Sequence, residues 1–371
     1  MKPRILVATV ATLTACRGGA PTGPAQGTTE TKAPQGTTTA ATAQGTTTAA
    51  TAETTGAPGK ARPPLVLVRD VPLPGGATRF DYQDIDPARG HLFIAHMNDA
   101  SVVVANLSDG AAVKVLPGIP RARGVVVAAD IGRVFVTSSP NKVVVIDAVS
   151  LEIKRRVDTG TAPDGIAWDP VDKTVAVSDQ GDGAVSLLRN EGEGARETVP
   201  LGKETGNVIF DGPRRRLWVT VVSASPPDQL VAIDPVAAKV VTRIPLPGCS
   251  GAHGLRLTPD GSSALVACED NDVLARVDLA GTAPIVTAKT GAGPDVLSVD
   301  PGLGWLYVAA ESGPLTVFDI GKPGLTKIDE ERLGDNAHSV AVDPATHQVY
   351  FPLQRGPDGT PVLRVMRPSG S

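Results

Sequence analysis

The chain has 371 residues, with 35 lysines and arginines against 39 aspartates and glutamates, and so a formal net charge of −4. This slightly acidic balance provides no general attraction for nucleic acid or for an anionic lipid surface. Aromatic residues make up only 3% of the chain, so a folded core must be built mainly from Val, Leu, Ile and Ala.

Residues 1–15 have the pattern of an export signal. Lys2 and Arg4 precede an apolar stretch at 5–13, which is too short to remain as a transmembrane helix. The stretch ends in LTAC at 13–16, which resembles the lipobox of bacterial lipoproteins, where the signal is cleaved before the cysteine and the thiol receives the lipid. We therefore expect a lipoprotein signal peptide over 1–15 and an anchor on Cys16 that does not span the membrane.

Two details qualify that expectation. Arg17 follows Cys16, and the resemblance then favours the outer membrane, on its periplasmic or surface face, over retention at the inner membrane. The alternative is a plain secretory signal in which Cys16 is incidental.

Residues 16–63 offer no material for a core. They are almost entirely Thr, Ala, Gly, Pro and Gln, and 35–43 is repeated as 44–52. So few large apolar side chains cannot bury enough surface to offset the entropy of ordering the backbone. We predict a disordered tether over 16–63 and a single globular domain over 64–371.

Within that domain a short pattern recurs seven times: an apolar run, a turn residue often followed by Pro, and a second run of β-formers about six residues later. The turn residues fall at 86, 128, 169, 211, 258, 300 and 343, a period of 41 to 47 residues. Such a period is typical of β-propeller blades. In the third copy we expect four strands, at 165–168, 174–178, 184–188 and 197–201, with Asp169-Pro170 as the first corner of a type I turn.

The ends of the domain predict how the ring closes. The last copy ends after its third strand, at 362–366, whereas 65–71 reads as an extra strand ahead of the first copy. An unclosed ring would leave an exposed sheet edge. The predicted fold is therefore all-β, a seven-bladed β-propeller of four-stranded antiparallel blades closed by the N-terminal strand.

Three stretches carry a family resemblance. Residues 161–170 (TAPDGIAWDP), 336–344 (NAHSVAVDP) and 133–137 (RVFVT) are similar to the YVTN repeat of YncE-like β-propellers, and the likeness extends over all seven copies. The resemblance implies the propeller fold. Members include surface-layer proteins, nucleic-acid binders and electron-transfer subunits, so it does not imply one activity.

Alignment of the copies exposes one polar position at the start of each inner strand, five residues before the turn residue. Inner strands line the central channel of a propeller, so these side chains should form a ring at one channel mouth. The predicted ligand-binding ring is Asp81, Arg123, Asp164, Asn207, His253, Asp295 and His338. The second strands should add His96, Asp179, Glu269 and Glu311 on the same face.

Imidazole nitrogens and carboxylate oxygens are ligands for divalent metals. Because they come from successive blades, His253, Asp295 and His338 are the expected metal trio, with a divalent ion as the possible cofactor. The alternative is a solvated channel rim that holds no ligand, because polar residues at a water-filled mouth need none.

Without Cys16, the cysteines are the pair Cys249 and Cys268. An even pair in an exported chain favours a disulfide, here one that would pin the loop carrying His253. A metal-thiolate or redox pair is the alternative, although the 19-residue separation is not a CxxC motif.

The sequence lacks a GxSxG elbow, a P-loop, an HExxH motif and a CxxCH haem motif, so it predicts no catalytic residue. We expect an envelope-anchored propeller that serves as a binding or scaffolding module for a small-molecule or protein ligand. The alternative function is a metal-dependent, lactonase-like hydrolase. Nucleic acid is the less favoured partner because Arg155-Arg156 and 214–216 fall in outer strands or turns.

Overall fold

The structure is a computed structural model that describes residues 64–369. The expected signal peptide at 1–15, the tether at 16–63 with the lipidation residue Cys16, and residues 370–371 lie outside the described residues. No helix among the described residues is long and apolar enough to cross a membrane.

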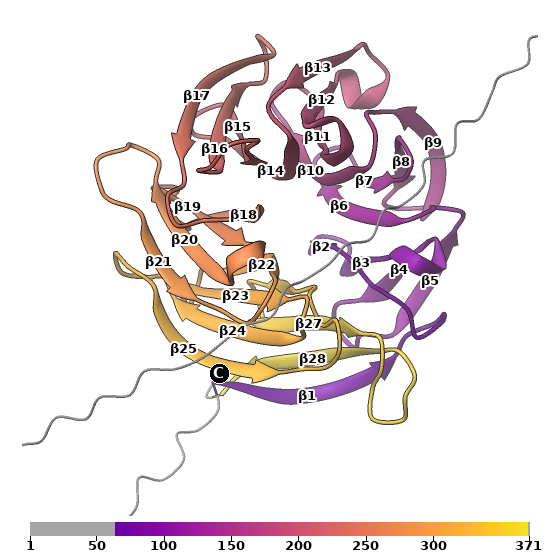
Figure 1. Cartoon of the computed structure of the whole chain (residues 1–371). Coiled ribbons are helices and arrows are strands. Elements are labelled where there is room, and N and C mark those ends of the chain that lie inside the picture. Colours follow the sequence, from indigo (N-terminus) through magenta and orange to yellow (C-terminus); the bar gives the residue numbers. More distant parts are fainter. Residues whose placement is uncertain (1–63, 370–371) are drawn as a thin grey trace, which may run out of the picture. The chain divides into compact units, whose positions relative to one another are not determined.

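The described residues fold into seven antiparallel sheets of four strands each, arranged as the blades of a β-propeller (Figure 1). Blades 1 to 3 contain β2 (Gln83–Asp86), β3 (His91–His96), β4 (Ser101–Asn106) and β5 (Ala112–Pro117); β6 (Ala122–Ala128), β7 (Arg133–Ser138), β8 (Lys142–Asp147) and β9 (Glu152–Asp158); and β10 (Pro163–Asp169), β11 (Thr174–Asp179), β12 (Ala184–Leu188) and β13 (Arg196–Pro200). The predicted fold class is confirmed.

Blades 4 to 6 contain β14 (Glu204–Asp211), β15 (Arg216–Val222), β16 (Gln229–Asp234) and β17 (Lys239–Pro245); β18 (Ala252–Leu257), β19 (Ser263–Cys268), β20 (Val273–Asp278) and β21 (Val286–Lys289); and β22 (Pro294–Asp300), β23 (Trp305–Ala310), β24 (Pro314–Asp319) and β25 (Thr326–Arg332). Blade 7 contains β26 (Ala341–Asp343), β27 (Gln348–Leu353) and β28 (Val362–Pro368). The helices in this part of the chain are single 3-10 turns: η1 (Met97–Asp99), η2 (Gln180–Asp182), η3 (Asn190–Gly192) and η4 (Glu269–Asn271).

The N-terminal strand closes the ring, as predicted. Strand β1 (Leu65–Pro72) pairs antiparallel with β28 as the outermost strand of blade 7, whose order is β1-β28-β27-β26. Arg364 on β28 donates two hydrogen bonds to the carboxylate of Asp70 on β1, at 2.9 and 2.7 Å. The two ends of the domain therefore share one sheet.

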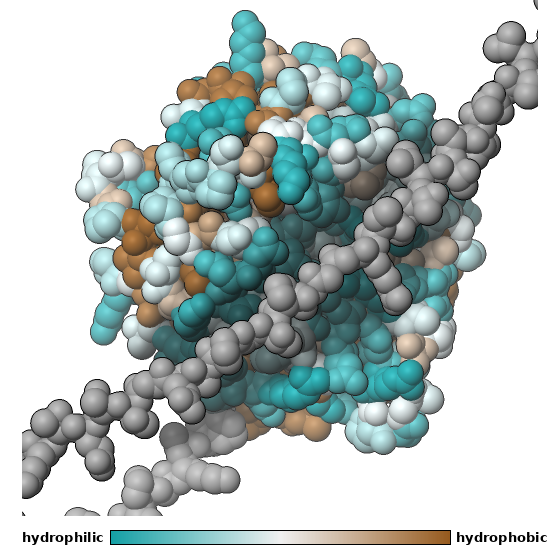
Figure 2. All heavy atoms as spheres, in the orientation of Figure 1, coloured by the Kyte–Doolittle hydropathy of each residue, from teal (hydrophilic) through white to brown (hydrophobic). Residues whose placement is uncertain are grey.

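The core lies between neighbouring blades. The two middle strands of each blade are buried on both faces, as β7 and β8 illustrate, because each sheet packs face to face against the next. Outer strands such as β9 alternate between exposed and half-buried residues. Figure 2 shows that the visible face is hollowed at its centre and that mostly hydrophilic residues surround the hollow.

A β-bulge near the start of the inner strand recurs in five blades. In blade 2 the pairing jumps from Ala122 to Val125, so Arg123 and Gly124 together face Thr137. Equivalent breaks occur in blades 3, 4, 5 and 6, at the ring positions predicted from the repeat alignment. A bulge bends the strand and turns a side chain away from the regular alternation. The bulges are therefore the local structure that presents the ring side chains.

Candidate functional site

Glycines next to the ring residues allow the inner strands to approach one another. A Cβ on Gly254 would lie 1.9 Å from the carbonyl oxygen of Asp295, and one on Gly124 would lie 2.2 Å from that of Asp164. Thr137 links blades 2 and 3, because its hydroxyl accepts a hydrogen bond from the Gly124 amide and donates one to the Asp164 carbonyl. The backbone around the channel mouth is thus closely packed and held in register from blade to blade.

Tyr82 crosses the channel and joins three ring residues. Its hydroxyl accepts a hydrogen bond from Nδ2 of Asn207 at 2.6 Å and donates one to Oδ1 of Asp295 at 3.1 Å. Nε2 of His253 lies 3.3 Å from the same hydroxyl. Blades 1, 4, 5 and 6 are therefore connected through one buried phenol.

The charged groups at this mouth interlock. Nε2 of His253 lies 3.2 Å from Oδ2 of Asp164 and 3.4 Å from Oδ1 of Asp295. Arg123 lies 3.6 Å from Asp164 and donates a hydrogen bond to Gln180 at 2.8 Å. The ring residues are not dispersed around an open pore, because their side chains converge across the channel.

Arg79 supplies a second cation to the mouth. Its guanidinium contacts both carboxylate oxygens of Glu311, at 2.7 and 3.1 Å, and lies 3.7 Å from Asp81 and 3.9 Å from Asp295. Asn336 donates a further hydrogen bond to Glu311. Arg79 thus partly neutralises three carboxylates from two blades, Asp81 of blade 1 and Asp295 and Glu311 of blade 6.

These groups line a small polar cavity of about 100 Å³, which we call the mouth pocket. It is formed by Arg79, Asp81, Tyr82, Arg123, Asp164, Gln180, His253, Glu269, Asp295 and Glu311. Five carboxylates face two arginines and one histidine, so the pocket carries an excess of acidic groups even when His253 is protonated.

Burial and this charge imbalance shift the pKa values of the pocket residues. Burial raises the pKa of Asp295 and of Asp81, although His253 and Arg79 oppose the respective shifts. Burial alone would lower the pKa of His253, but its hydrogen bond to Asp164 and the charges of Asp295 and Asp164 outweigh burial and raise that pKa to about 10. The carboxylates around His253 thus favour its protonated form in this arrangement.

His338 behaves in the opposite way. Burial and the charge of Arg79 lower its pKa to about 4, so the ring is neutral. Its Nδ1 lies 3.1 Å from the carbonyl oxygen of Asn336 and must donate the proton, because a carbonyl only accepts. The lone pair is then on Nε2, which is buried and has no hydrogen-bond partner within the described residues.

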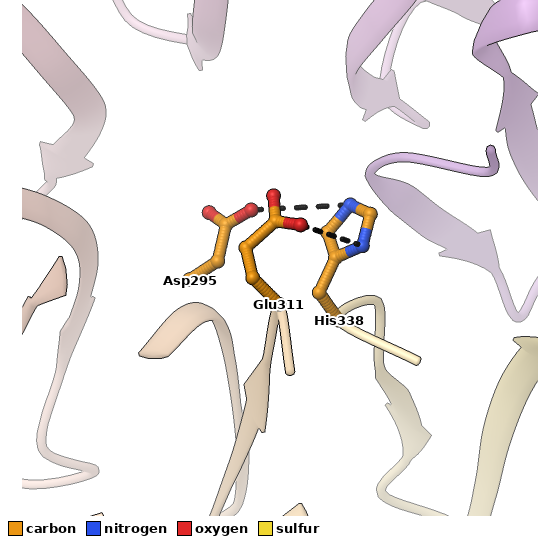
Figure 3. A group of neighbouring side chains, drawn as sticks. All are labelled: Asp295, Glu311 and His338. Atoms are coloured by element: carbon orange, nitrogen blue, oxygen red, sulfur yellow. Dashed lines mark ion pairs between the residues drawn. The ribbon is translucent and has the colours of Figure 1, made fainter. Parts of the chain in front are cut away.

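Asp295, Glu311 and His338 form the one group within residues 64–369 that could hold a metal ion. Each offers a ligand atom, and these atoms lie within 4.8 Å of one another. Figure 3 shows the two carboxylates and the imidazole side by side, with Nε2 of His338 3.9 Å from Oδ2 of Asp295. Compared with the trio expected from sequence, Glu311 stands in place of His253.

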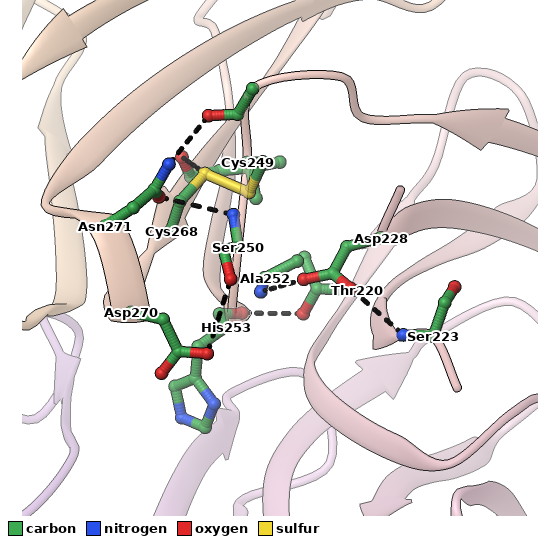
Figure 4. Close-up of a disulfide and its surroundings, with 12 residues drawn as sticks. Thr220, Ser223, Asp228, Cys249, Ser250, Ala252, His253, Cys268, Asp270 and Asn271 are labelled. Atoms are coloured by element: carbon green, nitrogen blue, oxygen red, sulfur yellow. Dashed lines mark hydrogen bonds between the residues drawn. A yellow bond between two sulfur atoms is a disulfide. The ribbon is translucent and has the colours of Figure 1, made fainter. Parts of the chain in front are cut away.

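Cys249 and Cys268 form a disulfide that joins the loop before β18 to the end of β19 (Figure 4). The same loop is held by Asn271, whose side chain bonds the backbone of Ser250 and Gly248. On the other side of His253, the hydroxyl of Thr220 accepts a hydrogen bond from the backbone amide of Asn207 and donates one to the carbonyl oxygen of His253 at 2.6 Å. The disulfide thus helps to set the position from which His253 enters the mouth pocket.

Two residues expected at the mouth serve other purposes. His96 is buried, stacks on Phe80 with ring centroids 4.0 Å apart, and bonds Thr78. Asp179 is also buried and accepts hydrogen bonds from Thr159, Gly160 and Ser186 within its own blade region. Both anchor loops, whereas Glu269 and Glu311 do line the mouth pocket.

Sequence reasoning missed Arg79 and Tyr82. The repeat alignment held a signal for Tyr82, because the residue after the ring position is Gly124, Gly165 and Gly254 in three other blades. A large aromatic side chain at a position that is glycine in those blades is expected to project into the channel. Arg79 lies two residues before the ring residue Asp81, a position that the repeat alignment did not single out.

No family model matches the chain, and no curated protein matches it either. Many solved structures do match, and three of them share a TM-score of 0.66 with this chain. They are hydrazine synthase of Kuenenia stuttgartiensis (17% identity; 78% of this chain and 96% of that chain covered), virginiamycin B lyase of Staphylococcus aureus (15%; 81% and 99%) and a streptogramin B lyase (12%; 81% and 97%). At these identities the likeness establishes the propeller fold alone.

Proposed function

We propose that this protein is a binding β-propeller of the cell envelope and that it binds a divalent metal ion beside its mouth pocket, where Asp295 and Glu311 of the pocket meet the buried His338. The observation that carries the proposal is the buried Nε2 of His338, which has no hydrogen-bond partner among the described residues and lies 3.9 Å from Oδ2 of Asp295. Asp295, Glu311 and His338 each offer a ligand atom within 4.8 Å of the others. Two oxygen ligands and one neutral imidazole suit Zn²⁺, Mn²⁺ or Fe²⁺.

The electrostatics of the pocket support a cationic ligand. Burying carboxylates without enough positive charge raises their pKa, as for Asp295 and Asp81, and a divalent ion would supply the missing charge. Arg79 now holds both oxygens of Glu311, so a bound metal must compete with this guanidinium. Asp81, 3.7 Å from Arg79, is the carboxylate that could retain the arginine.

The test is metal titration of the chelator-treated protein by calorimetry with Zn²⁺ and Mn²⁺. We expect one ion per chain, binding at least about tenfold weaker in His338→Gln and in Glu311→Gln, and unchanged binding in the control His91→Gln. His253→Gln separates the two trios, because it should leave metal binding in place if Glu311, and not His253, is the ligand. Equal binding by all variants, or none by the wild type, would refute the metal site.

The envelope location and the family remain part of the proposal. The lipobox-like residues at 13–16 support a lipid anchor on Cys16, and the YVTN-like repeats support membership of the YncE-like propellers. Expression in a bacterial host with an alkyne-tagged palmitate should label the wild-type protein and leave Cys16→Ser unlabelled and released from the membrane fraction. Label that persists in Cys16→Ser would disprove the anchor.

A second candidate function is a metal-dependent enzyme, either a lactonase-like hydrolase or a lyase. Its support is the pair His338 and Asp295, in which Nε2 of His338 lies 3.9 Å from Oδ2 of Asp295. The pKa of His338 is lowered and that of Asp295 is raised, as expected for a general base and a general acid at neutral pH. Two of the similar folds are lyases by name. Metal-dependent turnover of a lactone, virginiamycin B or streptogramin B that is lost in His338→Gln would favour this reading over simple binding.

A further inference from the structure

A second and larger cavity lies on the other side of Tyr82. It has a volume of about 470 Å³ and is lined by residues of the inner strands β2, β6, β10, β14 and β18, which surround the centre of the ring in Figure 1. We call it the lumen cavity and define it by Tyr82, Asp84, Val126, Trp168, Phe210 and Arg256. Tyr82 lines both cavities and, with Asn207, separates them.

The walls of the lumen cavity expose similar amounts of polar and apolar surface. Val126, Ile166, Trp168, Ile209 and Phe210 provide the aliphatic and aromatic part. Val126, Ile209 and Phe210 are only half-buried, so solvent reaches this surface. The volume of the cavity falls within the range of small-molecule sites.

Arg256 is the cation of this cavity, and its charge is not paired. Within residues 64–369 it has no carboxylate within 4.0 Å, and its hydrogen bond is from Nη1 to the neighbouring backbone carbonyl of Leu255, at 2.9 Å. Burial lowers its pKa, although the charge of Asp84 opposes the shift. By contrast, Arg276 in blade 5 bonds three backbone carbonyls.

Asp84, the carboxylate that lines the same cavity, does not form an ion pair with Arg256. One of its oxygens accepts the amide of Ile85 at 2.9 Å, and the other accepts the amide of Val127 at 2.8 Å. The carboxylate is thus used to join β2 to β6 and is held away from the guanidinium. The guanidinium of Arg256 therefore has no protein carboxylate as a direct partner among the described residues, and a ligand carboxylate can supply one.

We propose that the lumen cavity binds a small carboxylic acid with an apolar, preferably aromatic, body. Its carboxylate would pair with Arg256, whose planar fork matches two carboxylate oxygens, and its body would contact Trp168 and Phe210. Arg256 is the one cation that lines this cavity among the described residues, which suits a monoanion and not a polyphosphate. This site is separate from the mouth pocket, so it goes beyond the proposed function and stands without it.

The probe is 2-naphthoate, with 2-naphthamide as the uncharged match. We expect calorimetry to give one naphthoate per chain and the amide to bind at least about tenfold more weakly. Arg256→Met keeps the apolar stem but removes the charge, and it should weaken naphthoate by at least about tenfold; Arg243→Met, which alters an exposed arginine on β17, should leave it unchanged.

Two further measurements keep the test decisive. Melting curves verify that each variant is folded, and if Arg256→Met is not, Val126→Phe reduces the cavity volume instead and should also weaken naphthoate. Naphthoate should quench tryptophan fluorescence in the wild type and not in Trp168→Phe. Equal binding of naphthoate and naphthamide, equal binding by the wild type and Arg256→Met, or no binding at about 1 mM naphthoate would overturn the proposal.

Discussion

The hydroxyl of Tyr82 donates a hydrogen bond to Asp295 across the propeller channel, at 3.1 Å, and so joins blade 1 to blade 6. The two residues are 213 positions apart in the chain. Tyr82 lines both the charged mouth pocket and the lumen cavity, so this contact helps to shape both candidate sites.

Removing that hydroxyl should destabilise the domain. Tyr82→Phe leaves Asn207 without its acceptor and removes one hydrogen-bond donor from Asp295, and loss of partners for buried polar groups costs about 1–3 kcal/mol. Tyr307→Phe is the matched control, because the hydroxyl of Tyr307 is buried and has no hydrogen-bond partner among the described residues. Urea unfolding should show a clear loss for Tyr82→Phe and little change for Tyr307→Phe; similar losses would contradict the bridging role.

Gly254→Ala should disturb the approach of blades 5 and 6. The new Cβ would lie 1.9 Å from the carbonyl oxygen of Asp295, so the strands must separate, at a cost of about 1–3 kcal/mol or more. Gly212→Ala, where the nearest atom is 3.7 Å away, serves as the control. The measurement is the melting temperature of each variant, and an unchanged value for Gly254→Ala would show that the mouth is loosely packed.

Deletion of residues 65–71 should lower the melting temperature far more than deletion of residues 20–59. The first deletion removes most of β1, exposing the β28 edge and breaking the Asp70–Arg364 pair. The second leaves every described contact in place. Equal effects of the two deletions would rule out closure by β1 as a source of stability.

The stability of the domain should fall as the pH rises above neutrality. The folded-state pKa of His253 is raised to about 10, above an ordinary value of about 6.5, so the folded protein keeps a proton that the unfolded chain loses. The contribution is therefore complete below about pH 6.5 and is lost as the pH rises toward 10. The raised pKa values of Asp81 and Asp295 act in the same direction at lower pH.

Thermal melting between pH 6 and 10 tests this dependence. His253→Gln should flatten the decline at the alkaline end, whereas His91→Gln should leave the slope of the wild type unchanged. A wild type whose melting temperature rises with pH across this range would show that His253 is not held as an imidazolium.

Reduction of the disulfide should loosen the fifth blade. Cys249 and Cys268 close a loop with a sequence separation of 19, for which the chain-entropy model gives about 3 kcal/mol. The double variant Cys249→Ser, Cys268→Ala should show that loss in urea unfolding, and reductant should lower the stability of the wild type but not of the variant. A variant as stable as the oxidised wild type would make the bond dispensable.

The fold was predictable from local patterns. Each blade repeats its own turn residue and β-formers, as Asp86 and Asp300 show, and adjacent strands in one blade are neighbours in sequence. Even the closure followed from counting, because three strands at the C-terminus required a fourth, and 65–71 was available. Strand pairing within a blade follows from the order of the strands in the sequence and does not require knowledge of distances across the channel.

The sites depended on features that no repeat contains. The alignment located Asp164, His253, Asp295 and His338 at equivalent positions, but whether they touch depends on the width of the channel and on the bulges that aim them.

By itself, then, the sequence determined the seven blades, their closure and the ring positions, because these follow from short-range periodicity. Only the tertiary structure decided that Tyr82 spans the channel, that Arg79 reaches Glu311, and that Arg256 has no carboxylate within 4.0 Å among the described residues. The physical reason is that these relationships are set by distances across the channel between residues far apart in the chain, and by what burial there does to charge.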